Sequence, residues 1–447
     1  DDSFSAWQST LPYQLTNAHH EVLAEIRADL RTGQPMNRLL HGDVGSGKTV
    51  VAALGMAIVI HNGAQAALMA PTSILAEQHF RSLSLLLTAG NEQTALLRPE
   101  EIRLLIGDTK TAEKEEIRAG LEDGSIKLII GTHALLEDPL VFQNLQMVVI
   151  DEQHRFGVEQ RAILRAKGNN PHLLVMTATP IPRSLALTVY GDLDLSLMDE
   201  YPAGRQKIET IVLYPREREQ AYSKIESEVD AGRQAFIIYP LVEQGDNDEA
   251  KAAVEECDRL QKEVFHHYRL GLLHGRLKPD EKEKVMTAFR NRELDVLVST
   301  SVVEVGVDIP NATIMMVEGA NRFGLAQLHQ FRGRVGRGEF PSYCILVPET
   351  ENAVDNERLK AMAETNDGFI LAEKDLEQRG PGDFLGTRQA GFSDLRLASL
   401  SDVRLIEKAR EAAQMVFDQD PDLNLPEHQN LVQTLQRFWR PGRGDIS

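Results

Sequence analysis

The chain has 447 residues, more than one ordinary hydrophobic core accommodates, so we expect about two to four domains. Its 42% hydrophobic and 26% charged residues are typical of soluble globular proteins. The longest apolar run, residues 50–60, is shorter than the ~20 residues of a membrane span. The net charge of −19 excludes a surface that is basic overall, although a narrow basic track on an acidic body can bind nucleic acid.

The N-terminal residues contain no basic segment followed by an apolar stretch, so the sequence gives no indication of secretion. Cys257 and Cys344, the two cysteines, are too few for a disulfide framework or a zinc site. We therefore expect two buried thiols in a reducing cytoplasm.

The first half of the chain alternates predicted strands with helices. Its strands lack strict polar–apolar alternation, which indicates a parallel sheet covered on both faces. Helices are predicted at 49–61 and 73–87. The predicted strands are 38–41, 66–70, 102–106, 127–130, 147–150 and 172–176.

A Gly-Asp-Val-Gly-Ser-Gly-Lys-Thr motif lies between the first predicted strand and the helix at 49–61. Its glycines let backbone N–H groups surround phosphates at the positive end of a helix. We expect Lys48 to neutralise the β and γ oxygens of ATP and Thr49 to ligate Mg²⁺. The alternative is a glycine-rich turn without a ligand. The expected binding residues are Gly42, Asp43, Val44, Gly45, Ser46, Gly47, Lys48 and Thr49.

Two carboxylates follow the strand predicted at 147–150. A carboxylate there can hold Mg²⁺, and its neighbour can orient and deprotonate the attacking water. We assign Asp151 to the metal and Glu152 to the water. An Asp-Glu pair alone is more often a solvated turn, but the loop at Lys48 favours the catalytic interpretation.

The alternation restarts after residues 202–205, which we interpret as a linker. Residues 243–256 carry six acidic residues and one lysine, and we expect a solvated loop that runs into a helix. Strand patterns fade from about residue 350, where helices and loops are predicted. Helices are predicted at 217–231, 279–290 and 325–332, and strands at 208–213, 235–239, 270–273, 294–299, 313–317 and 342–347.

Arg332, Arg334 and Arg337 follow the helix at 325–332 with intervening glycines, which makes a basic loop. Arginine suits the charge that spreads over phosphoryl oxygens in a transition state. We therefore hypothesise that the second half senses the γ-phosphate of ATP bound to the first. The alternative is a surface cluster without catalytic function.

Further motifs are residues 151–160 (Asp-Glu-Gln-His-Arg-Phe-Gly-Val-Glu-Gln), 177–183 (Thr-Ala-Thr-Pro-Ile-Pro-Arg), 306–308 (Gly-Val-Asp) and the segment 366–389, which contains Gln-Arg-Gly-Pro-Gly and Gly-Thr-Arg-Gln. Together they resemble the motifs of superfamily 2 helicases, and most closely those of the RecG family of bacterial DNA helicases. The resemblance extends from about residue 11 to the C-terminal segment.

The resemblance implies an α/β protein with two tandem RecA-like parallel-sheet domains and a C-terminal helical hairpin and loop. We place the ATP-binding domain at 1–204, the second domain at 205–350 and the extension at 351–447. It also implies an ATP-driven, Mg²⁺-using motor on duplex DNA that remodels stalled replication forks and Holliday junctions in recombination and repair. We expect a monomer in the bacterial cytoplasm, associated with the nucleoid and not with membranes, whose partners include replication and repair proteins.

The resemblance also implies roles for individual residues. Lys48, Thr49, Asp151 and Glu152 keep the roles given above. Arg334 and Arg337 correspond to arginine fingers, and Gly306 and Asp308 would face the nucleotide. Thr177 and Thr179 would couple the nucleotide state to DNA binding. The residues expected at the DNA backbone are Pro71, Thr72, Thr132, His133 and Thr300.

Helix caps and strand ends are the alternative explanation of those hydroxyl residues.

Residues 366–389 resemble the translocation element that the RecG family shares with the transcription-repair coupling motor. In the family this element transmits domain closure to DNA movement, and Arg379 and Gln389 would lie in or near its loop. The alternative is a C-terminal helix and turn packed on the second sheet.

The chain departs from the family at two points. His19 occupies the position of a glutamine that reads adenine, and it lacks the paired donor and acceptor of an amide. Family members also carry an N-terminal wedge domain with an OB-fold, whereas this chain begins almost at the motor, so junction specificity is not implied.

An RNA helicase is one rival function, against which Gln153 and residues 366–389 argue. A nucleotide-gated DNA-binding scaffold without translocation is the other.

Overall fold

The computed structural model describes residues 14–90, 95–137, 140–151, 166–177, 193–201, 207–240, 253–300, 309–379 and 403–438, with residues 7, 9, 182 and 186. The chain divides into two compact units. One comprises Asp1–Pro180 and Ser196–Leu371 and holds the two β-sheets. The other comprises Ile181–Leu195 and Ala372–Ser447 and includes helices α16 (Val403–Gln419) and α17 (Gln429–Phe438).

Among the described residues, seven strands form the first sheet in the order β3-β4-β2-β5-β6-β1-β7. The pairings from β3 through β1 are parallel, as predicted. All six predicted strands are confirmed, and β7 is an addition that the sequence analysis missed. The strands are β1 (Asn37–Gly42), β2 (Gln65–Met69), β3 (Ile102–Leu105), β4 (Leu128–Gly131), β5 (Leu145–Asp151), β6 (His172–Thr177) and β7 (Asp194–Met198).

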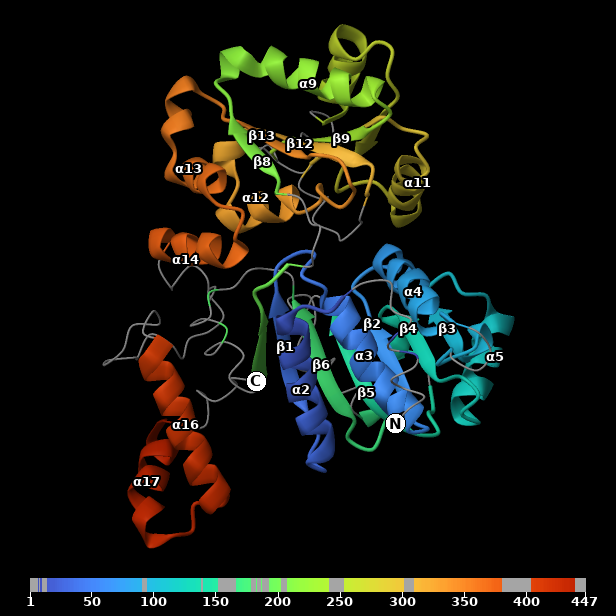
Figure 1. The fold of residues 1–447 in the computed structure, drawn as a ribbon, viewed down its shortest axis with the longest axis vertical. Helices are drawn as coiled ribbons and strands as arrows, with labels where there is room; N and C mark the ends of the chain where they lie inside the picture. The colour runs from blue at the N-terminus through green and yellow to red at the C-terminus, as the bar shows by residue number, and fades with distance from the viewer. Residues whose placement is uncertain are drawn as a thin grey trace. The chain divides into compact units, whose positions relative to one another are not determined.

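Helix α3 (Lys48–His61) is the central helix of this first region and packs against β1, β2 and β5 (Figure 1). It is apolar on most of its surface because it lies inside the hydrophobic core, where α2 and α4 also pack against it. α4 (Ser73–Leu87) packs on β3 and β4. The helices at 49–61 and 73–87 are thus confirmed. The helices that the sequence analysis did not predict are α2 (Asn17–Arg31), α5 (Thr111–Glu122) and α6 (Ala134–Glu137).

Six described strands form the second sheet in the order β10-β11-β9-β12-β13-β8, with all five pairings parallel. Alternate residues of β9 enter separate cores: Phe236 and Ile238 lie in one, and Ala235 and Ile237 in the other. Both faces are buried, which explains why the strand sequences do not alternate. The strands are β8 (Glu209–Val212), β9 (Gln234–Ile238), β10 (Leu270–Leu273), β11 (Val296–Ser299), β12 (Ala312–Glu318) and β13 (Tyr343–Val347).

The helices of the second region confirm the sequence prediction closely. α11 (Pro279–Arg290) and α12 (Leu325–Arg332) begin and end at the predicted residues, and α9 (Arg218–Asp230) packs on β9 and β12. The chain continues without described strands through α13 (Glu357–Glu364) and α14 (Gly368–Arg379). The predicted linker at 202–205 and most of the acidic segment at 243–256 lie outside the described residues.

The two cysteines differ in their surroundings. Cys344 is buried in β13, and burial raises the pKa of its thiol to about 12. Cys257 is only partly buried, and its surroundings raise the thiol pKa to about 11. The prediction of two buried thiols is therefore confirmed for Cys344 and wrong for Cys257. In the part of the chain that the structure describes, no helix combines the length and apolarity needed to span a membrane.

Phe236 supports the second sheet through an edge-to-face contact with Phe289, with ring centroids 5.0 Å apart. Both rings are buried, so Phe236→Ala leaves a cavity and should lower the free energy of unfolding by ~3–5 kcal/mol. We expect faster hydrogen exchange in peptides from β9 and β12, measured by mass spectrometry. Phe340→Ala, at a ring that is 42% exposed, is the control. Unchanged exchange in the Phe236 variant would contradict this packing.

Candidate nucleotide-binding site

Residues 42–49 connect β1 to α3, which confirms that the glycine-rich motif lies between a strand and a helix. Gly45 and Gly47 have φ angles of 79° and 92°, in the region that only glycine adopts readily. A Cβ atom at Gly47 would also lie 2.3 Å from His19 Nε2. Glycine at position 47 is therefore required by both the backbone conformation and the close approach of His19.

Lys48 is buried inside this loop. Its Nζ donates to the carbonyl oxygens of Gly42 and Asp43 at 2.7 Å each. The Ser46 hydroxyl is also buried and has no hydrogen-bond partner among the described residues. An ammonium group, a buried hydroxyl and the first N–H groups of α3 are together the donors that a phosphate requires. The residues present thus fit the predicted ligand.

His19 lies between the start of α2 and this loop. Its Nδ1 accepts from the Thr16 backbone N–H at 2.9 Å, while Thr16 Oγ1 accepts from the His19 N–H at 3.3 Å. Burial lowers the pKa of the imidazole, although the neighbouring Ser46 backbone acts in the opposite direction. One ring nitrogen thus caps α2 and the other faces Gly47. That His19 contacts adenine stays a prediction.

Asp151 ends β5, as predicted, and its Oδ2 lies 2.7 Å from Nε2 of His79 on α4. His79 is buried, and the sequence analysis did not single it out. The available signal was a histidine on the buried face of a predicted helix. A histidine that holds a metal-binding carboxylate fixes the orientation of that carboxylate. Glu152 lies outside the described residues.

The described residues contain no group of three or more side chains that would hold a metal by themselves. Mg²⁺ in proteins keeps several waters and uses one or two protein ligands together with substrate phosphates. The Thr49 hydroxyl and the Asp151 carboxylate are of the right chemical type. Their role as Mg²⁺ ligands stays a prediction.

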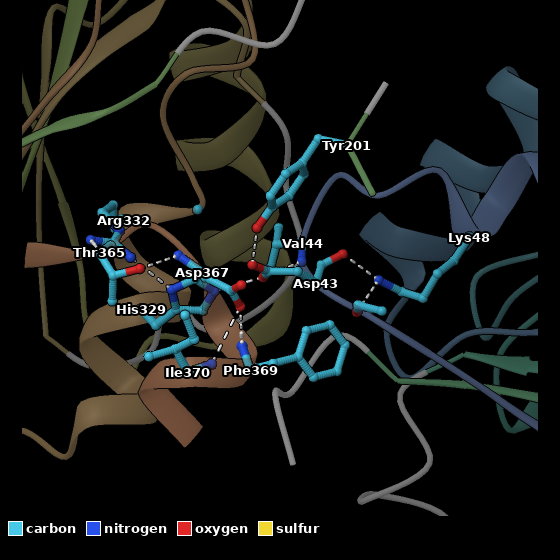
Figure 2. Close-up of polar contacts among 12 residues, drawn as sticks. Asp43, Val44, Lys48, Tyr201, His329, Arg332, Thr365, Asp367, Phe369 and Ile370 are labelled. Carbon is cyan, nitrogen blue, oxygen red and sulfur yellow. Dashed lines mark hydrogen bonds and ion pairs between the residues drawn. The ribbon is translucent and has the colours of Figure 1, made fainter. Parts of the chain in front are cut away.

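Arg332, on α12, is not a phosphate-binding arginine in this structure. Its guanidinium donates to the carbonyl oxygens of Met362 at 2.7 Å and Thr365 at 2.9 Å. It also donates to His329 Nδ1 at 3.1 Å, and its side chain is buried (Figure 2). Arg332 therefore ties α12 to the segment between α13 and α14. The hypothesis that the second half senses the γ-phosphate therefore rests on Arg334 and Arg337.

The loop that follows α12 approaches the phosphate-binding loop. A Cβ atom at Gly333 would lie 3.1 Å from Val44 Cβ. Arg334, the residue after Gly333, is buried. Arg337 donates from Nε to the Gly333 carbonyl oxygen at 3.0 Å. The structure thus brings the two loops together, while direct contact of Arg334 or Arg337 with a phosphate stays a prediction.

Asp43 makes the most extensive contacts of the site (Figure 2). Its carboxylate accepts from the Val44 N–H at 2.6 Å, from His329 Nε2 at 2.6 Å and from the Tyr201 hydroxyl. Burial alone would raise the pKa of Asp43, but the attraction of His329 and these hydrogen bonds hold it well below its usual range. Asp43 was predicted to bind the nucleotide, whereas His329 and Tyr201 had no predicted role.

Three family models match the chain. They are "DEAD/DEAH box helicase" at 17–188, "Helicase conserved C-terminal domain" at 220–339, and "ATP-dependent DNA helicase RecG, domain 3, C-terminal" at 365–441. The chain is 51% identical over 438 residues to the ATP-dependent DNA helicase RecG of Synechocystis sp., and 48% identical over 426 residues to that of Thermotoga maritima. The chain belongs to the RecG family.

The alignments cover 98% and 95% of this chain but 52% and 53% of these two RecG proteins, so the chain spans about half their length. A solved structure of RecG bound to a three-way DNA junction matches with a TM-score of 0.74 at 46% identity, over 90% of this chain and 51% of that one. The helicase Lhr of Mycobacterium smegmatis matches with a TM-score of 0.55 at 17% identity, over 79% of this chain and 48% of that one, which shows the fold alone. The prediction of two RecA-like sheets is confirmed.

The residues that the RecG resemblance assigns to DNA lie at the carboxyl ends of strands. Pro71 and Thr72 follow β2, Thr132 and His133 follow β4, and Thr177 ends β6. In a parallel sheet these ends share one edge, which is also the edge of Gly42 and Asp151. Thr72 in addition caps α4 by accepting from the Leu75 N–H at 3.4 Å, so the helix-cap explanation holds for it.

The remaining predicted residues are either buried or lie wholly or partly outside the described residues. Thr300 follows β11 and is buried. Arg379 is the last residue of α14, and its side chain lies outside what the structure describes. The same holds for the whole of Thr179, Gly306, Asp308 and Gln389. Contacts of all these residues with DNA or nucleotide stay predictions.

We expect His79→Ala to raise the Mg²⁺ concentration for half-maximal ATP hydrolysis by about tenfold, because the carboxylate of Asp151 loses the group that orients it. Magnesium titrations of ATPase activity measure this, and magnesium-dependent binding of a fluorescent ATP analogue gives a second readout. His20→Ala, at an exposed histidine on α2, is the matched control. An unchanged magnesium requirement would refute the positioning role of His79.

Proposed function

We propose that this chain is the motor part of an ATP-dependent DNA helicase that translocates on duplex and branched DNA. The observation that carries the proposal is that α12 and the loop after it contact the phosphate-binding loop, through His329 with Asp43 and Gly333 with Val44. A motor of this kind needs contacts to ATP from the regions of both sheets, because hydrolysis then changes the contacts between the two regions. Membership of the RecG family supports DNA as the track.

The proposed division is an ATP-binding domain at 1–204, a second domain at 205–350 and an extension at 351–447. Lys48 and the loop N–H groups bind the phosphates, and Thr49 and Asp151 hold Mg²⁺. The metal, when bound, neutralises phosphate charge. Glu152 accepts the proton of the attacking water, and Arg334 and Arg337 stabilise the transferred phosphoryl group.

Thr177 is well placed to couple these events to DNA. It ends β6, which pairs with β5 on one side and β1 on the other, so it lies between the strands that carry Asp151 and Gly42. A ligand bound at either strand end therefore lies near the end of β6. The DNA contacts proposed for Pro71, Thr132 and His133 lie at the same edge, so nucleotide and DNA act on one set of strand ends.

The proposed substrates are duplex DNA, replication forks and Holliday junctions, in recombination and repair. A RecG structure bound to a three-way DNA junction supports branched DNA as the substrate class. Because the net charge is −19, binding has to use a local basic track, and it will weaken strongly as salt rises. We further propose a monomer in the bacterial cytoplasm, at the nucleoid, with replication and repair proteins as partners.

The test compares ATPase activity with fork, linear duplex and single-stranded DNA and single-stranded RNA at one salt concentration, together with displacement of a triplex-forming strand. We expect the strongest stimulation by fork and duplex DNA, and ATP-dependent displacement. Lys48→Ala should abolish both, because the ammonium that neutralises phosphate is lost. Lys360→Ala, at an exposed residue of α13, is the control. Preferential stimulation by RNA, or hydrolysis without displacement, would overturn the proposal.

Arg379→Ala should leave DNA-stimulated hydrolysis largely intact while slowing triplex displacement, because Arg379 ends α14 in the proposed translocation element. The ratio of strands displaced to ATP hydrolysed measures this uncoupling. Equal loss of both activities would argue against a coupling role.

A further inference from the structure

Asp43 connects the phosphate-binding loop to the second sheet through two different groups. Its backbone carbonyl accepts from Lys48 Nζ at 2.7 Å. Its carboxylate accepts from His329 Nε2 at 2.6 Å, and both of these side chains are buried. One residue therefore contacts both the lysine expected to bind phosphate and the helix that precedes the arginine loop (Figure 2).

The direction of the hydrogen bonds around His329 follows from its neighbours. Arg332 approaches His329 Nδ1 at 3.1 Å, and a guanidinium has donors but no acceptor. Nδ1 is therefore the acceptor, and the hydrogen on Nε2 is donated to Asp43. The Asp43 carboxylate also accepts from the Val44 N–H and the Tyr201 hydroxyl, and these hydrogen bonds favour its ionised form.

Close packing leaves these groups little room to rearrange. Gly368 begins α14, and a Cβ atom there would lie 2.6 Å from His329 Nε2 and 2.7 Å from Asp43 Oδ2. Arg332, one turn after His329 on α12, is held by the Met362 and Thr365 carbonyl oxygens. Two contacts thus set the orientation of α12. His329 is held by Asp43, and Arg332 is held by the segment before α14.

We propose that Asp43 and His329 are a positioning pair that places the loop of Arg334 and Arg337 against the phosphate-binding loop. The arginine loop begins at Gly333, directly after α12, so a helix fixed at His329 fixes the start of that loop. Neither residue of the pair needs to touch ATP for this role. The inference rests on the proposed function, because it assigns the pair to the same ATP site.

The test measures kcat and KM for ATP with saturating fork DNA, together with the Kd of a fluorescent ATP analogue. Asp43→Ala and His329→Ala should each lower kcat at least about tenfold, with Kd changed less than about threefold, because the arginine loop is displaced and the phosphate loop remains. The double variant should be no slower than either single variant. His329→Gln, whose amide retains an N–H donor, should recover most of kcat.

A matched control uses His428 and Asp420, a second, partly buried His–Asp pair whose Nδ1 and Oδ2 lie 2.8 Å apart. His428→Ala should leave kcat within about twofold of the unsubstituted protein. A second arm measures urea unfolding of the unsubstituted protein, Asp43→Ala, His329→Ala and the double variant, without nucleotide or DNA. Non-additive changes in the free energy of unfolding there show that the pair forms in solution, whatever the activity.

The outcomes separate the two proposals. If the unsubstituted protein hydrolyses no ATP, the proposed function fails, and the unfolding cycle still decides whether the pair exists. If hydrolysis is normal and His329→Ala leaves kcat unchanged, the positioning role fails alone. Additive losses in the double variant, or a loss of nucleotide affinity equal to the loss of kcat, would also overturn it.

Discussion

The buried carboxylate of Asp43 constrains the site more than any other group. A buried charge is tolerated only when hydrogen bonds replace its water, and Asp43 obtains three from separate parts of the chain. The Val44 N–H comes from its own loop, the Tyr201 hydroxyl from the residues after β7, and His329 Nε2 from α12. Moving any one of these segments removes a hydrogen bond from the buried carboxylate, so their positions depend on one another.

Three histidines support the candidate site in the same way. His19 faces the phosphate-binding loop, His79 holds Asp151, and His329 holds Asp43. His19 and His329 also use the second ring nitrogen, with Thr16 and Arg332 respectively. An imidazole can accept at one nitrogen while it donates at the other, so His329 links α12 to the phosphate-binding loop with both of its ring nitrogens hydrogen-bonded.

The parallel strands of the first sheet bring the candidate nucleotide-binding residues and the residues proposed for DNA to the edge formed by their carboxyl ends. β1 and β5 end at the phosphate loop and at Asp151, while β2, β4 and β6 end at the residues proposed for DNA. Since α3 is buried on nearly all sides, the strand that precedes it cannot move without disturbing the core. Movement between ATP states is therefore expected in the contacts between loops, such as Val44 with Gly333, more than within either sheet.

Local sequence determined the phosphate loop, the RecG resemblance and most strands. The glycines at 45 and 47, Lys48 and Thr49 act within a few residues of each other, and burial on both faces gives strands such as β9 their apolar sequences. α2 and β7 were missed although the sequence carries their signals, because the apolar residues of α2 recur at helical spacing and β7 alternates polar residues with leucines.

The tertiary structure alone decided which groups meet. Asp43 and His329 are 286 positions apart, and His79 and Asp151 are 72 apart. No periodicity or spacing relates residues at such separations, because side-chain contacts depend on how the elements between them pack. Packing also gives Arg332 a role that differs from those proposed for Arg334 and Arg337. All three arginines look alike in sequence, but only the fold shows that Arg332 is used to hold backbone carbonyl oxygens.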